Sequence, residues 1–139
     1  MGQPIFSPET VFNFYPPSYQ IPGTEITAPE FGIQNAATAL ARSNFINTVI
    51  LQGGAAPNST VTGSTGTSIN LSAFTGAKDN AAMIAALNQT LMHGSLSSDA
   101  SGIILSAANA AAVNSSDPLA AVRAAAYLML TSGQYQVER

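Results

Sequence analysis

Residues 29–53 read PEFGIQNAATALARSNFINTVILQG, the longest uninterrupted helical pattern in the chain and the stretch that decides the fold. Apolar residues recur in it at steps of three and four, as one helical stripe: Ile33, Ala37, Leu40, Ala41, Phe45, Val49 and Ile50. Thr27 and Glu30 fit a capping box, in which each side chain bonds the backbone N–H of the other residue. Pro29 would lie in the first turn, where its missing N–H is not needed, and Gly53 would end the helix.

Three further helical patterns follow this stretch, and together they predict an all-α fold, a bundle of about four main helices. We expect these helices at residues 29–52, 79–93, 98–113 and 118–132. Gly94 would stop the second helix, and Ser97 or Ser98 would cap the third. Asp117 would cap the fourth, with Pro118 at its first helical position.

The remaining segments predict the domain organisation. Residues 1–28 are rich in proline and aromatic residues and would form an extended N-terminal strap, while residues 29–139 would form the helical domain. A Ser/Thr/Gly-rich insertion at 54–77 interrupts that domain. It would be either a loop or a short hairpin that pairs residues 61–62 with residues 68–71.

Composition excludes several classes of function. Charged residues make up only 8% of the chain, against about 25% in an average soluble domain. The net charge is −3 with four Lys and Arg in total, too few to neutralise a nucleic-acid backbone. There is no cysteine for disulfides or thiolate chemistry, no apolar run long enough to span a membrane, and no signal peptide at the N-terminus. A surface so poor in charge favours packing against another copy or another segment.

Aromatic side chains in the strap are the first candidate binding residues: Phe12, Phe14, Tyr15 and Tyr19. One interpretation is that the strap lies across the helices and buries these rings. The alternative is a carbohydrate-binding face, in which the rings serve as apolar platforms for sugars. Pro22-Gly23 predicts a turn within the strap.

Catalytic chemistry has few candidate residues. His93, the only histidine, precedes a capping glycine, where it would bond the last carbonyls of its helix. An alternative is a serine-type hydrolase, with His93 as base, Asp99 or Asp117 as the orienting carboxylate and a serine as nucleophile. No G-x-S-x-G motif supports it. A single histidine and scattered carboxylates predict no metal site, and nothing predicts a cofactor.

Four short stretches resemble the C-terminal part of the bacterial family called "domain of unknown function 1800". They are residues 10–19 (TVFNFYPPSY), 28–31 (APEF), 91–94 (LMHG) and 131–139 (TSGQYQVER). Ser18 stands where the family has Asp, and Gly133-Gln134 stand where it has Pro-Glu. A Trp-His-Asn-His motif lies upstream in the family and has no counterpart in this chain, so no functional residue is carried over.

The resemblance implies a mostly helical piece of an exported or cell-envelope bacterial protein, with Met1 as an internal methionine. From it and from the composition, we expect a non-catalytic packing or interaction module, associated with a surface or a polysaccharide. The alternative is the small esterase-like hydrolase that uses His93. The expected partners are a second copy or the missing upstream segment, with carbohydrate as a further candidate. One face of the last helix is the candidate contact surface: Leu119, Val122, Tyr127 and Leu130.

Overall fold

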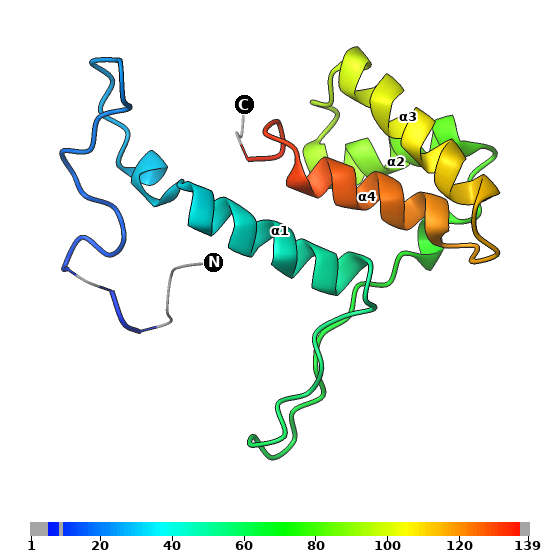
Figure 1. Ribbon diagram of the computed structural model, residues 1–139, viewed down its shortest axis with the longest axis horizontal. Coiled ribbons are helices and arrows are strands. Elements are labelled where there is room, and N and C mark those ends of the chain that lie inside the picture. Colours follow the sequence, from blue (N-terminus) through cyan, green and yellow to red (C-terminus); the bar gives the residue numbers. More distant parts are fainter. Residues whose placement is uncertain (1–5, 9, 137–139) are drawn as a thin grey trace. The chain divides into compact units, whose positions relative to one another are not determined.

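The computed structural model describes residues 6–8 and 10–136 (Figure 1). Its elements, in chain order, are the 3-10 helix η1 (Pro29–Ile33), α1 (Ala36–Ile50), the 3-10 helix η2 (Ser72–Phe74), α2 (Asn80–Met92), α3 (Ser98–Val113) and α4 (Ala120–Thr131). Only isolated antiparallel bridges occur between the described residues outside the helices. The expected all-α fold with four main helices is therefore confirmed.

The chain divides into two compact units, an N-terminal unit (Met1–Phe45) and a helical unit (Ile46–Arg139). The N-terminal unit contains the strap, η1 and the first part of α1. The helical unit contains the end of α1, the insertion, and α2 to α4. The division falls inside α1 rather than at the expected end of the strap.

The long helix expected at residues 29–52 is broken, and the predicted capping box is wrong. Ala28, not Thr27, precedes η1, and no side chain caps it. Thr27 instead pairs with Gln20 in an antiparallel bridge, which holds its backbone extended. Gln34 is also extended, with φ −87° and ψ 102°, and this residue separates η1 from α1.

The N-terminus of α1 has a different cap, which residues 35–38 form. The Thr38 backbone N–H donates to Asn35 Oδ1 at 3.0 Å, and the Asn35 N–H donates to Thr38 Oγ1 at 3.0 Å. The Thr38 hydroxyl also donates to the Ile33 carbonyl at 2.6 Å, which ties the cap to η1. Two orphan N–H groups are thereby satisfied by one reciprocal pair, as in a capping box.

The expected apolar stripe of α1 is buried only at its C-terminal end. Val49 and Ile50 belong to the core of the helical unit together with Ile46, which the stripe did not include. Leu40 and Phe45, in the N-terminal unit, are 62% and 48% exposed. The periodicity predicted the helix correctly, but the apolar face of its first turns remains open.

The core of the helical unit is built around α4, which packs against both α2 and α3 (Figure 1). Ala125, Ala126 and Met129 are completely buried, and the two alanines have no side chain beyond Cβ to hold the neighbouring helices away. Val122 is 3% exposed, and the other three residues of the proposed contact face pack against the core: Leu119, Tyr127 and Leu130. Val122 is therefore part of the core, and the other three residues are partly buried against it, so the neighbouring helices cover most of this face.

Side-chain caps fix where α2 and α3 begin. Asp79 Oδ1 accepts the Ala82 N–H at 2.8 Å, and Ser97 Oγ accepts the Ala100 N–H at 3.3 Å. The cap predicted at Ser97 is thus confirmed. The start of α4 differs from the prediction: the helix begins at Ala120, and Leu119 precedes it without a side-chain cap.

The insertion pairs differently from the predicted hairpin. Ala55 and Thr67 form one antiparallel bridge, with N–H to O distances of 2.8 and 3.0 Å, and the two arms of the insertion run side by side (Figure 1). Gly54 and Gly66 have positive φ angles of 125° and 76°. A Cβ on Gly54 would stand 2.4 Å from the Thr67 carbonyl oxygen, so glycine is required where the arms approach.

Candidate functional site

The strap folds into two consecutive turns that build one wall of a groove. The Asn13 N–H donates to the Thr10 carbonyl at 3.0 Å, and the Phe12 N–H donates to Thr10 Oγ1 at 3.2 Å. Asn13 has a φ of 63°, a left-handed conformation that asparagine tolerates better than most residues. After it, the Tyr19 N–H donates to the Pro16 carbonyl at 3.0 Å. These turns fix the direction of the intervening aromatic residues.

A third turn brings the end of the strap back to η1. The Thr24 N–H donates to the Ile21 carbonyl at 3.0 Å across Pro22-Gly23, where Gly23 has a φ of 80°. Proline followed by a positive-φ glycine is the pattern of a type II turn, so the predicted turn is confirmed. The Ala28 N–H then donates to the Tyr19 carbonyl at 3.0 Å. The beginning of η1 is in this way bonded to the strap.

The strap, η1 and the start of α1 enclose a groove of about 410 Å³, which we name the neutral groove. Its lining residues are Thr10, Phe12, Asn13, Phe14, Pro16, Pro17, Gly32, Ile33, Asn35 and Thr38. All of them lie in the N-terminal unit and none carries a charge. The volume lies in the range of ordinary small-molecule sites.

The four aromatic candidates take different positions around the neutral groove. Phe12 and Phe14 line it, and Phe12 is 58% exposed. Tyr19 packs against Gly32 of the lining, because its ring lies 3.4 Å from the position of a Cβ on Gly32. Tyr15 is 36% exposed and is not part of the lining.

Polar residues of the neutral groove were not among the sequence candidates. Asn13 makes no side-chain hydrogen bond to any residue in the described part of the chain, so its amide is available to a ligand. Asn35 uses only its Oδ1 within that same part of the chain, which leaves its Nδ2 group available. The Asn-x-x-Thr spacing of Asn35 and Thr38 is the sequence signal that could have identified this cap.

His93 lies at the end of α2 in the left-handed conformation, with φ 50° and ψ 31°. Its backbone N–H donates to the Asn88 carbonyl, and the Gly94 N–H donates to the same oxygen at 3.2 Å. The imidazole is exposed and forms no hydrogen bond or ion pair within residues 6–8 and 10–136. The backbone of His93, rather than the expected side chain, therefore satisfies the helix end.

The two candidate carboxylates are not joined to His93. Asp117 Oδ1 accepts the Leu119 N–H at 2.9 Å, and Asp117 Oδ2 pairs with the Arg123 guanidinium. Asp99 is exposed in the first turn of α3, where a negative charge favours the helix dipole. Each carboxylate therefore has a structural role near the start of a helix, and the structure does not assemble a Ser-His-Asp arrangement from these residues.

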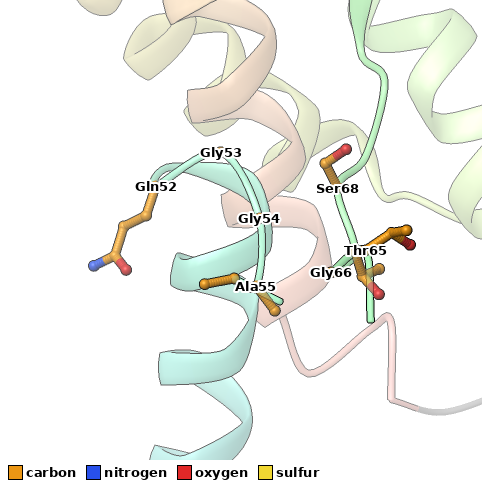
Figure 2. Close-up of a pocket in the computed structure, with 9 residues that line it drawn as sticks. Gln52, Gly53, Gly54, Ala55, Thr65, Gly66 and Ser68 are labelled. Atoms are coloured by element: carbon orange, nitrogen blue, oxygen red, sulfur yellow. The ribbon is translucent and has the colours of Figure 1, made fainter. Parts of the chain in front are cut away.

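A second pocket, of about 290 Å³, lies between the arms of the insertion. Figure 2 shows Gly53, Gly54 and Ala55 on one arm and Thr65, Gly66 and Ser68 on the other. The Gln52 side chain extends away from the facing arm (Figure 2). Backbone and small side chains make up most of this lining, so the pocket offers few groups that would recognise a ligand.

Searches for other kinds of site gave the following results. No group of three or more His, Cys, Asp or Glu residues that could hold a metal ion occurs in the part of the chain that the structure describes. None of the described helices is both long and apolar enough to span a bilayer. In the comparisons with known proteins, no family model, curated protein or solved structure matches the chain.

Proposed function

We propose that this protein is a non-catalytic interaction module whose N-terminal unit contacts its partners. The observation that carries the proposal is the number of large apolar side chains that this unit leaves about half exposed or more: Phe6, Val11, Phe12, Ile26, Leu40 and Phe45. Where exposed apolar side chains form a contiguous patch larger than a few hundred Å², the patch marks an interaction surface.

A second copy of the chain is the first partner that we propose. With 8% charged residues, the chain has few like charges to oppose contact between copies. Leu40 and Phe45 are the proposed contact residues, since both are exposed apolar side chains on α1. The α4 face is replaced in this role, because Val122 is buried and the other three residues of the face are partly buried against the core.

We also propose that the chain belongs to the family that its motifs resemble, as part of an exported or cell-envelope protein. In support, two of the motif stretches are joined to each other, and a third is joined to the start of α3. The stretches at 10–19 and 28–31 are joined by the bond between Ala28 and Tyr19. In the stretch at 131–139, Gln134 Oε1 accepts the Ser97 N–H at 3.1 Å and Gln134 Nε2 donates to Ser97 Oγ at 2.9 Å, at the N-cap of α3. Such contacts give the motifs a packing role, which agrees with a non-catalytic module.

Analytical ultracentrifugation over a range of concentrations tests the proposed self-association. The wild-type chain is expected to associate reversibly, and Leu40→Glu is expected to shift it to the monomer. Because Leu40 is 62% exposed, the substitution should change the stability of the fold by no more than about 0.5 kcal/mol. Ile103→Glu, at an exposed apolar residue of α3 in the helical unit, is the matched control. A wild-type chain that stays monomeric at the highest concentration would contradict the proposal.

A further inference from the structure

The neutral groove has properties that self-association through α1 does not explain. Its wall and floor come from segments about twenty residues apart in the sequence, at 10–17 and 32–38. Leu40 and Phe45 are not part of its lining. We infer that the neutral groove is a binding site for an uncharged carbohydrate, an activity that goes beyond the proposed self-association.

The apolar part of the groove suits the C–H faces of a sugar ring. Phe12 is more than half exposed, yet it lies in a concave lining with Phe14, Pro16 and Pro17. Aromatic and proline rings present flat apolar surfaces, against which the C–H groups of a pyranose pack without needing a charge. An exposed ring within a groove is thus a surface available for stacking.

The polar part of the groove suits hydroxyl groups. The Asn13 amide supplies two N–H donors and one acceptor, and Asn35 Nδ2 supplies further donors. Sugar hydroxyls both donate and accept, so a side-chain amide can satisfy them in either sense. Thr38 is not a candidate, because its hydroxyl is already bonded to the Ile33 carbonyl.

The lining residues that the structure describes carry no charge, and this selects between ligand classes. Phosphate or carboxylate ligands are normally bound by Arg or Lys, and metal cations by carboxylates, but all ten lining residues are neutral. A proline-rich peptide is also neutral, and docks in grooves lined by aromatic residues. The unused amide groups of Asn13 and Asn35, which come from two different segments of the lining, favour a ligand that carries several hydroxyl groups.

The groove is held in shape before a ligand binds. Asn13 is fixed by its backbone bond to Thr10, and Asn35 by the reciprocal cap with Thr38. The Tyr19 ring lies against Gly32 and supports the floor. A preformed site loses little conformational entropy on binding, which favours recognition of a weakly binding sugar.

Titration of the labelled full chain with neutral glucose hexasaccharides, followed by NMR chemical shifts, tests the inference. Cellohexaose, laminarihexaose and maltohexaose are the probes, and the Leu40→Glu background keeps the test independent of self-association. We expect at least one probe to give saturable shifts confined to residues 10–17 and 32–38, with a Kd of about 1 mM or lower. No saturable shift with any probe at about 10 mM would overturn the inference.

Two variants and one control assign binding to the groove. Phe12→Ala is expected to weaken binding about threefold to tenfold through the lost stacking surface. Asn13→Gly keeps the positive-φ backbone and removes the amide, and we expect a loss of similar size. Ile26→Ala, at an exposed apolar residue outside the groove, should leave Kd unchanged. The site would be refuted if both groove variants bind the sugar as the wild type does and keep a native circular dichroism spectrum. It would also be refuted if a proline-rich peptide shifts the same residues while none of the three sugars does.

Discussion

His93→Gly is expected to stabilise the protein, although it removes the only histidine. His93 has a φ of 50°, and its exposed side chain forms no bond within the described residues that the substitution would remove. The left-handed conformation costs an L-residue about 1–2 kcal/mol, which glycine avoids. Glycine loses about 0.5–1 kcal/mol more backbone entropy on folding. The difference predicts a net stabilisation of roughly 0.5–1 kcal/mol.

Thermal unfolding followed by far-UV circular dichroism measures this effect. For a chain of this size the predicted stabilisation corresponds to a rise in Tm of about 2–6 °C. His93→Ala keeps the left-handed strain and loses no bond, so its Tm should stay within about 2 °C of the wild type. Gly94→Ala is the opposite control: Gly94 has a φ of 83°, and an L-residue there should lower the stability by about 1 kcal/mol.

A fall in Tm for both His93 variants would refute this reasoning, because it would mean that the imidazole makes a stabilising contact. The same variants test the hydrolase alternative. We expect hydrolysis of a chromogenic ester by His93→Ala to equal that of the wild type. Loss of a clear wild-type activity, with Tm unchanged, would establish His93 as a catalytic residue instead.

Two further predictions concern the cap of α1 and the core. Asn35→Ala should destabilise the start of α1 by about 1 kcal/mol and speed amide hydrogen exchange at residues 36–39, whereas Thr27→Ala should change neither, since Thr27 caps no helix. Met129→Ala should lower the free energy of unfolding, measured in urea, by about 2–5 kcal/mol, because Met129 is completely buried between helices; the surface control Val113→Ala should change it by less than about 0.5 kcal/mol.

Local signals predicted most of the helical unit. The Ser97 cap is a contact between residues three apart in the sequence, so it is visible in the sequence itself. The periodicity of α2, α3 and α4 likewise predicted elements whose bounds differ by at most two residues from those observed. The start of α4 was placed two residues too early, since Asp117 bonds Leu119 and Arg123 rather than capping the helix directly.

Features that depend on competition between segments were not predictable in this way. Thr27 fits a cap by spacing, but its backbone is held in a bridge to Gln20, and the helix therefore begins at a later cap. In α4, alanines on several faces made the buried face ambiguous, and only the packing of α2 and α3 decides it. The neutral groove includes two of the four predicted aromatic residues, while Asn13 and Asn35 join them through turns that the sequence pattern did not specify.

The proposal that the N-terminal unit is the interacting part of the chain is tested by amide hydrogen exchange. Exchange is measured at protein concentrations below and above those at which the chain associates. We expect association to slow amide exchange in residues 36–45 and in the described part of the strap. Exchange in α2, α3 and α4 should be unchanged, because most of the large apolar side chains of these helices pack in the core of the helical unit. Protection that appears on α4 and leaves residues 36–45 unchanged would contradict the account.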